Sequence, residues 1–517
     1  MHKRLFVKKM HRCGWVLSEG LERVWRMDLV PWARNRNRRD KARMIPVVDV
    51  FAGPGGLNEG FSSVEHLGRP VFDIVASFEM EQNAVETLVL RSAVRELSRG
   101  GCLPRPYQEF LAGSIAWRAL IEEREMDKAL RRARAHVHMM ELGPSARKTA
   151  AGFIASALGG REDWVLIGGP PCQAYSLVGR SRRKHDPEFL KDKKHFLYRE
   201  YLDIIQRFKP AVFVMENVKG LLSAGHHGFN MFNLIMSDLA MNGRYEIRSF
   251  VVPDEHPQPK DFVIRAENYG IPQRRHRVIL LGIRNDLGNV GLKPLHPQPV
   301  VTVRHAIHDM TRLNPRVTRT THPQETVLSR ARDKGVKLAA ALASPGRGIE
   351  TSETGTADEL RSWLRRHDVP ITQHEARGHM ESDLVRYTFL ATLAQEGRSF
   401  KVQELPEELR PKHKNVKGES TPFTDRFKVQ KWDAPGSTVA SHISKDGHYY
   451  IHPDPGQSRS LTVREAARLQ TFPDDYFFCG TRTKQYHQVG NAVPPLLAFK
   501  IAERVADLLG ERTSGSR

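Results

Sequence analysis

Short hydrophobic runs alternate with amphipathic stretches along much of the chain, and this alternation predicts strands separated by helices. The runs expected to form strands are 45–51, 71–78, 161–169, 211–217, 245–252 and 276–283. Helices are expected from Leu57 onward, over 83–97 and over 194–208. The order predicts an α/β fold in which helices cover both faces of a sheet.

The C-terminal segment carries further helix signals. Thr462 and Glu465 match the capping-box pattern, in which each side chain bonds the backbone of the other residue, so a helix should run through Gln470. Pro494 and Pro495 stand where a last helix should begin, because proline is tolerated in the first turn. We expect that helix to reach Leu509.

Two stretches interrupt the regular pattern. Residues 116–161 are charged and rich in Ala and Arg, and we interpret them as a helical insertion. Residues 286–458 are rich in Pro, His, Thr, Arg and Lys with weak periodicity, and we expect them to form a second, smaller domain. The main domain should then span 44–285 and be completed by the returning segment 459–517.

The charge of the chain points to a polyanionic partner. The 80 Lys and Arg residues against 59 Asp and Glu give a formal net charge of +21, and nucleic acid is the simplest partner for such an excess. Residues 1–43 hold 13 Lys or Arg against 4 Asp or Glu, which is typical of an exposed basic extension. Neither a membrane-spanning run nor a secretory signal is recognisable, so we expect a cytoplasmic protein.

The first expected strand runs into the glycine-rich turn "AGPGG", which allows a ligand to approach the backbone and a helix start. Asn58 takes the place of the last glycine in the dinucleotide pattern, so a pyrophosphate is not favoured. Glu79 ends the next strand, where an acid can accept hydrogen bonds from ribose hydroxyls. A nucleoside without phosphates fits both features, and S-adenosyl-L-methionine is the usual one. An ordinary α/β turn is the alternative for this signal alone.

The four cysteines, Cys13, Cys102, Cys172 and Cys479, form no C-x-x-C pair, and we expect free thiols without a zinc site or disulfide framework. Cys172 stands out because it follows two prolines at the end of a strand, in "GGPPCQAYS". Glu216 ends the next strand, in "MENV". A thiol and an acid on neighbouring strand ends suit attack on an electron-poor ring.

Seven short sequence blocks of the chain together resemble the ordered motifs of a known enzyme family. They are "DVFAGPGGLNEGF", "FEM", "GGPPCQAYS", "MENV", "NYGIPQRRHRVILLGI", "LTVREAARLQTFPDDY" and "QVGNAVPPLLA". In content and order they resemble the DNA (cytosine-5) methyltransferase family over residues 45–284 and 459–508. The resemblance implies a Rossmann-like, S-adenosylmethionine-dependent catalytic domain, with a target recognition domain in 286–458.

The resemblance also implies roles for single residues. The catalytic set comprises the nucleophile Cys172, which attacks C6 of cytosine, the acid Glu216, which contacts N3 and the exocyclic amine, and Arg275 and Arg277 beside them. The cofactor set comprises Phe51, Gly53, Gly55, Leu57, Glu79, Met80, Asn491 and Val493. The family's Gly-Asp-Ile block is best matched by Gly113-Ser114-Ile115, which would put Ser114 and Ile115 at the adenine without the usual acid.

The target base must be flipped out of the duplex to be reached. We expect the long basic loop after Cys172 to close over it, with Gln173, Ser176, Arg180, Arg182 and Arg183 contacting DNA. His374 and His379 do not have the spacing of the H-E-x-x-H metal motif, and no metal is expected.

Three alternatives stay open beside a DNA cytosine-5 methyltransferase of the restriction-modification type. A tRNA cytosine-5 methyltransferase shares the blocks but has a small recognition region. A non-catalytic DNA-binding relative would have lost Cys172 or Glu216. A hydrolase with a cysteine nucleophile would need a partner histidine and has no use for the other blocks. We expect a monomer acting on double-stranded DNA, with a restriction endonuclease encoded nearby as the implied partner.

Overall fold

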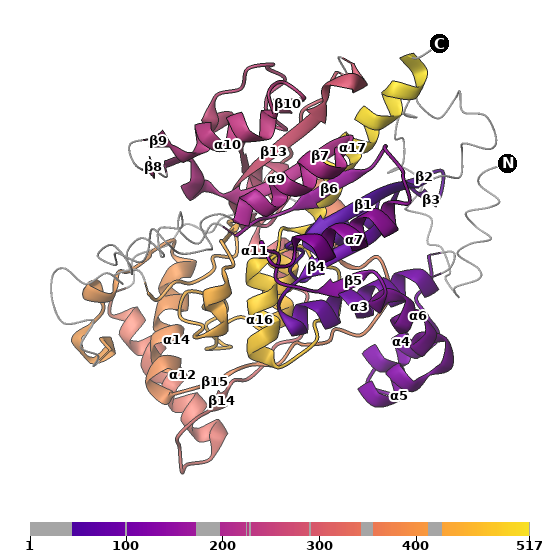
Figure 1. The fold of residues 1–517 in the computed structure, drawn as a ribbon. Helices are drawn as coiled ribbons and strands as arrows, with labels where there is room; N and C mark the ends of the chain where they lie inside the picture. The colour runs from indigo at the N-terminus through magenta and orange to yellow at the C-terminus, as the bar shows by residue number, and fades with distance from the viewer. Residues whose placement is uncertain are drawn as a thin grey trace.

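The computed structural model describes residues 44–98, 101–171, 197–223, 225–226, 229–288, 291–342, 355–411 and 426–515. Within these residues the largest sheet has eight strands, in the order β10-β13-β7-β6-β1-β4-β5, with β11 paired to β13 (Figure 1). Its strands are β1 (Ile45–Val50), β4 (Phe72–Glu79), β5 (Val137–Met139), β6 (Val165–Gly168), β7 (Val212–Val218), β10 (Tyr245–Arg248), β11 (Val263–Arg265) and β13 (His276–Arg284).

The five strands from β5 to β7 run parallel, and β13 enters antiparallel between β7 and β10. Parallel strands bring their carboxyl ends to the same edge of the sheet, which is where ligands bind in open α/β folds. All six expected strands are present, so the α/β prediction is confirmed.

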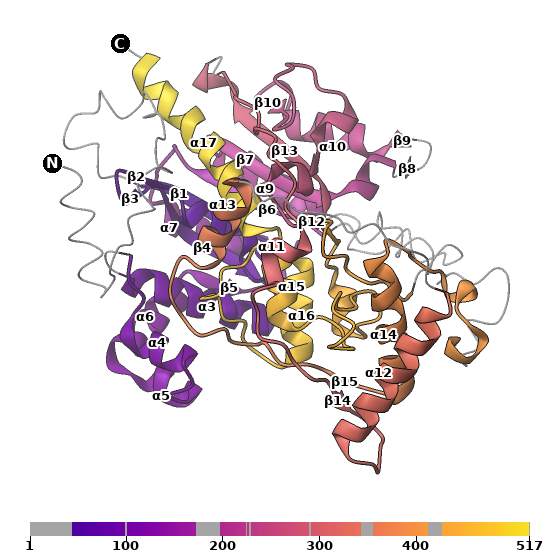
Figure 2. The ribbon, with the colours of Figure 1, turned by 180° about the vertical axis from the view of Figure 1, so that it is seen from behind.

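Helices cover both faces of the sheet (Figures 1 and 2). One face packs with α2 (Gly56–Ser62), α15 (Val463–Leu469) and α17 (Pro495–Gly515). The other face packs with α7 (Arg147–Leu158), α9 (Leu197–Phe208) and α10 (Met231–Ala240). Successive strand residues point to opposite faces of the sheet, so Val47 of β1 packs in one core and Val48 in the other.

The capping box is present as predicted. The Thr462 side chain accepts a hydrogen bond from the Glu465 backbone at 3.1 Å, and the Thr462 backbone donates to the Glu465 carboxylate at 2.7 Å. The last helix begins at Pro495, as predicted, and α3 (Gln82–Leu97) matches the helix expected over 83–97.

The stretch 116–161 is only partly an insertion, which corrects the expectation from sequence. It contains the helices α5 (Trp117–Glu122) and α6 (Arg124–Arg134), which form a core with α3 and α4 (Arg105–Leu111). It also supplies β5 and α7, which belong to the main sheet and its cover. Three strand residues are too few to show a period of two, so the sequence pattern did not reveal β5.

Residues 286–458 do not pack as one unit either. Helices α11 (Val303–Ile307) and α13 (Gly355–Leu364) join the core of the main sheet. Helices α12 (Gln324–Ala340) and α14 (Glu381–Gln395) form a separate core, and both views show them apart from the sheet (Figures 1 and 2). The chain therefore enters the separate core twice, at α12 and at α14. It returns to the core of the main sheet at α13 and again at α15, and then continues into α16 (Arg482–Asn491).

Short two-stranded pairings join the loops. They are β2 (Glu65–His66) with β3 (Arg69–Pro70), β8 (Gly225–His226) with β9 (Phe229–Asn230), β12 (Gln273–Arg274) with β16 (Gly436–Ser437), and β14 (Arg316–Val317) with β15 (Gly378–His379). Cys479 is a buried free thiol.

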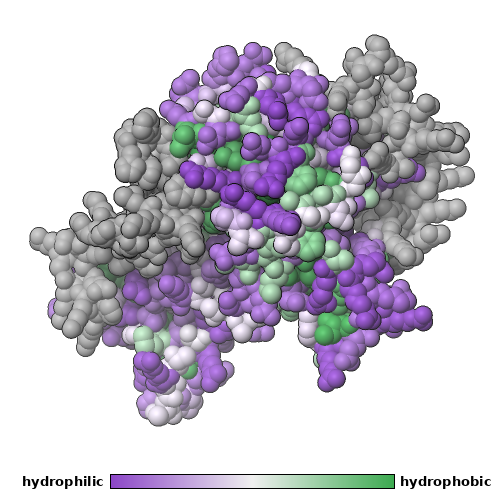
Figure 3. All heavy atoms as spheres, in the orientation of Figure 1, coloured by the Kyte–Doolittle hydropathy of each residue, from purple (hydrophilic) through white to green (hydrophobic). Residues whose placement is uncertain are grey.

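The surface described in Figure 3 is mainly hydrophilic, with hydrophobic side chains gathered toward its centre. Among the described residues, no helix has the length and hydrophobic character that crossing a membrane requires.

Candidate active site

The glycine-rich turn after β1 has a strained and open backbone. Phe51, Gly53 and Gly55 all have positive φ angles, of 55°, 55° and 91°. A phenylalanine rarely adopts this conformation, and such strain concentrates where a site needs it. The turn then leads directly into α2, where Leu57 is 5% exposed and packs into the core.

Glu79 holds this turn in place. One carboxylate oxygen of Glu79 accepts a hydrogen bond from the Gly53 backbone at 2.8 Å, and the other accepts from the Glu81 backbone at 2.9 Å. A side chain added at Gly53 would meet nothing within 4 Å, so open space lies beside the turn. Met80, the next residue, is 60% exposed although it is hydrophobic. An open cradle with an acid and an uncovered apolar side chain fits an adenosine group.

The returning segment closes the opposite side of the turn. The ideal Cβ of an alanine at Gly56 would lie 2.1 Å from the Val493 carbonyl oxygen, so the two backbones touch. Asn491, at the end of α16, is exposed, and Val493 is buried. The predicted cofactor residues 51–57, 79–80 and 491–493 are therefore brought together from three parts of the chain.

A second group of site residues lies on the neighbouring strands β6 and β7. Gly168 pairs with Met215, so Gly169 lies beside Glu216. A Cβ at Gly169 would lie 2.9 Å from one Glu216 carboxylate oxygen, so a larger residue here would displace the acid. The Asn217 side chain donates to the Pro170 carbonyl oxygen at 3.2 Å. Together these contacts hold residues 169–170 beside the acid at the end of β7.

The two predicted arginines have different surroundings. The Arg277 guanidinium lies 2.8 Å from the other Glu216 oxygen, with both side chains partly exposed at 16% and 14%. Arg275 is 2% exposed and donates to the carbonyl oxygens of Val439 at 2.8 Å and Gly490 at 3.3 Å. Burial is the main reason that the pKa of Arg275 lies below its usual value, and the nearby Arg277 charge adds to this. Arg277 is placed to orient the acid, whereas Arg275, just before β13, is bonded to the backbone at Val439 and at Gly490 of α16.

Several predicted site residues lie outside the described residues. They are the nucleophile Cys172 and the expected DNA contacts Gln173, Ser176, Arg180, Arg182 and Arg183. Their roles stay predictions from sequence.

The expected adenine contact at Ser114 and Ile115 is not supported by the sheet. Both residues lie in the connection between α4 and α5, and Ser114 is exposed. The strand beside Glu79 is instead β5, whose Met139 pairs with Glu79 and is 63% exposed. Glu141 follows two residues later and is also exposed. Met139 and Glu141 were not candidates from sequence, because the pattern did not reveal β5 as a strand.

Asp49 is a further buried acid beside the turn. It is 0% exposed, and burial raises its pKa to about 8, although the nearby Asn58 side chain acts to lower it. The carboxyl group is therefore expected to be neutral at pH 7 in the folded protein.

Comparison with known proteins now identifies the family. The sequence model of the C-5 cytosine-specific DNA methylases matches residues 162–507. The chain belongs to this family. It is 37% identical over 486 residues to the type II methyltransferase M.Bpa9945I of Bacillus paralicheniformis, covering 90% of this chain and 99% of that protein. It is also 27% identical to M.AgeI of Thalassovita gelatinovora, covering 66% of this chain and 82% of that one.

A solved structure supports the fold of this DNA methylase. A chain described as a DNA modification methyltransferase encoded within an E. coli prophage superposes with a TM-score of 0.52 at 19% identity, covering 90% of this chain and 99% of that one. The protein is thus a DNA (cytosine-5) methyltransferase with the Rossmann-like fold of S-adenosylmethionine-dependent methyltransferases. This family membership confirms the resemblance that the seven blocks carried.

Proposed function

We propose that this DNA methylase binds S-adenosyl-L-methionine in the cradle formed by residues 51–57, Glu79 and residues 491–493. The observation that carries the proposal is the open space beside Gly53, bordered by Glu79 and the exposed Met80. Glu79 would accept the ribose hydroxyls, while Met80 and Met139 would cover the adenine and Glu141 would accept from its amine. When bound, the cofactor supplies the methyl group.

The cytosine would be held where β6 and β7 end. Glu216 would bond N3 and the exocyclic amine, and Arg277 would keep the Glu216 carboxylate oriented toward the base. The Cys172 thiolate would add to C6, which turns C5 into a nucleophile for the methyl group. A base then removes the C5 proton, and the electron pair of that bond expels the thiolate by β-elimination.

Flipping a base out of a duplex costs unstacking energy, which contacts between the protein and the DNA must offset. The separate core of α12 and α14 supports this proposal, because it adds a second body beside the sheet that is available to contact the duplex. The basic loop after Cys172 is proposed to close over the base, and a monomer suffices because one base reacts at a time. Protection of host DNA beside a restriction endonuclease is the proposed role, by analogy with the type II relatives.

Bisulfite sequencing tests the activity. We would express the chain in a host that lacks cytosine-5 methylation, with Cys172→Ala and Glu216→Gln as variants. Methylation of one short motif by the wild type, lost in both variants, is expected. Soluble wild-type protein that binds S-adenosylmethionine but leaves DNA unmethylated would refute the DNA substrate, and tRNA would then be tested.

A covalent trap tests the mechanism. Duplex DNA with 5-fluorocytosine at the target cannot lose fluorine as a proton would be lost, so β-elimination stops. A denaturation-resistant protein–DNA adduct is expected with the wild type and not with Cys172→Ala. Failure of the active wild type to form this adduct would refute the role of Cys172.

A further inference from the structure

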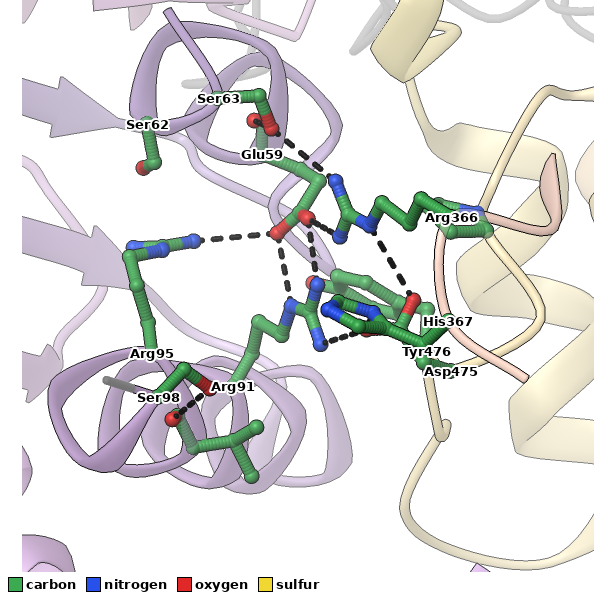
Figure 4. Close-up of polar contacts among 12 residues, drawn as sticks. Glu59, Ser62, Ser63, Arg91, Arg95, Ser98, Arg366, His367, Asp475 and Tyr476 are labelled. Carbon is green, nitrogen blue, oxygen red and sulfur yellow. Dashed lines mark hydrogen bonds and ion pairs between the residues drawn. The ribbon is translucent and has the colours of Figure 1, made fainter. Parts of the chain in front are cut away.

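A buried cluster of charged side chains joins three distant parts of the chain (Figure 4). We call it the ion cluster, and it consists of Glu59 on α2, Arg91 and Arg95 on α3, Arg366 and His367 after α13, and Asp475 after α15. None of these residues was singled out by the sequence analysis. The cluster is of interest because α2 begins directly after the proposed cofactor loop.

Glu59 accepts hydrogen bonds from three arginines. Its carboxylate accepts two hydrogen bonds from Arg91, at 2.7 and 2.9 Å, and one from Arg95 at 3.1 Å. It also pairs with Arg366. Its side chain is only 3% exposed. Burial alone would raise the pKa of Glu59, but the arginines outweigh it and hold the pKa well below its usual value.

Asp475 is the second acid of the cluster, and its side chain is 1% exposed. It lies 3.0 Å from Arg91, 3.4 Å from Arg366 and 3.1 Å from the His367 ring. Arg91 and Arg366 therefore both bridge the two acids, from opposite sides (Figure 4). The cluster fixes α2 to the segment around Asp475.

That segment contacts the cofactor loop directly. The hydroxyl of Tyr476, the residue after Asp475, donates to the Pro54 carbonyl oxygen. A Cβ at Gly55 would lie 3.0 Å from the same hydroxyl and 2.7 Å from Leu88 of α3. The loop is thus enclosed by elements that the ion cluster holds together.

Arg366 lies in residues 363–367, at the end of α13 and just after it, and we call this segment the strap. The Trp363 indole donates to the Thr471 carbonyl oxygen at 2.7 Å, and the Asp474 backbone donates to the Leu364 carbonyl oxygen at 2.8 Å. Beyond residue 367 the chain continues to β15 and α14, in the separate body. The strap is one of the connections between this body and the cofactor side of the sheet.

We propose that Arg366 is a positioning residue for the cofactor loop, and that it acts through Glu59 and Asp475. This inference rests on the proposed binding of S-adenosylmethionine by residues 51–57. The cluster holds three arginines against two carboxylates, so replacing Arg366 leaves two against two, and the protein should fold. What is lost is one of the two bridges that fix α2 relative to Tyr476, and the loop between them is then free to leave its binding shape.

Isothermal titration with S-adenosylmethionine tests this proposal, with Arg366→Gln as the variant. Arg365→Gln is the matched control, because Arg365 is the next residue and pairs with the half-exposed Asp309 outside the cluster. If the free energy that keeps the loop in its binding shape falls by about 1–2 kcal/mol, Kd rises roughly 5- to 30-fold. We expect that rise for Arg366→Gln, partial recovery in Arg366→Lys, and unchanged Kd for Arg365→Gln and for duplex DNA.

Hydrogen exchange of the amides in 51–57 gives a readout that needs no ligand. Exchange there should be faster in Arg366→Gln than in the wild type, with the strands of the sheet unchanged. Wild-type affinity and wild-type exchange in Arg366→Gln would overturn the inference, as would a parallel loss of cofactor and DNA binding. If the wild type binds no S-adenosylmethionine, the proposed function fails, and the exchange result still decides whether Arg366 organises the loop.

Discussion

Gly60→Ala tests whether the close packing of α2 on α17 is required. Gly60 lies inside α2, and an added Cβ would lie 2.4 Å from both the Ala498 Cβ and the Phe499 backbone nitrogen. Carbon atoms pack at about 3.5–4.0 Å, so the overlap is about 1 Å or more. Two of the three nearest atoms are backbone, in α17, and cannot rotate away. One of the helices must therefore move.

Two opposing free energies decide the result. Alanine in place of glycine inside a helix stabilises it by about 0.5–1 kcal/mol. Overpacking a close contact destabilises by about 1–3 kcal/mol. The overpacking term is the larger, so we expect Gly60→Ala to lower the free energy of unfolding by about 0.5–2 kcal/mol.

Gly152→Ala is the matched control. Gly152 lies within α7, is exposed, and a Cβ there would meet nothing within 4 Å. Only the stabilisation of the helix by alanine applies here, so the free energy of unfolding should rise by up to about 1 kcal/mol. Calorimetric melting should show a lower Tm for Gly60→Ala and a higher Tm for Gly152→Ala. Because α2 carries the cofactor loop, the S-adenosylmethionine Kd should also rise for Gly60→Ala alone. An equal rise in Tm for both variants would refute the packing argument.

Two further predictions concern buried acids and pH. Asp49 has a pKa raised from 3.8 to about 8 by burial, so the folded state binds a proton that the unfolded state has lost, and stability falls as pH rises across this range. Asp49→Asn removes that loss, and its Tm advantage over the wild type should grow from pH 5 to pH 8; a constant difference would contradict the assignment. Burial likewise raises the pKa of Glu503, on α17, from 4.5 to about 7, so Glu503→Gln should gain Tm relative to the wild type as pH rises over that interval and no further above it. Melting curves across this pH range, compared with an exposed change such as Glu122→Gln on α5, measure both effects.

Local patterns in the sequence determined much of this protein. The buried strands, the turn after β1, the capping box at Thr462 and the proline start of α17 depend on neighbouring residues, and each was predictable. Family-like blocks also indicated Glu79 and Glu216, because an acid at the end of a parallel strand lies at the ligand edge wherever the sheet forms. The α/β fold and the cytosine-5 methyltransferase family followed from these features.

Tertiary structure alone decided the remaining points, since they depend on residues that meet only after folding. Strand β5 has three residues and is defined by its pairing with β4, which places Met139 beside Glu79, whereas Ser114 and Ile115 lie between α4 and α5. Arg275 and Arg277 are two residues apart and equivalent in pattern, yet only Arg277 faces Glu216, because Val439 and Gly490 take up Arg275. The ion cluster could not be predicted from sequence for the same reason. An arginine and an acid that are hundreds of residues apart leave no local pattern, and they become partners only when the chain has folded.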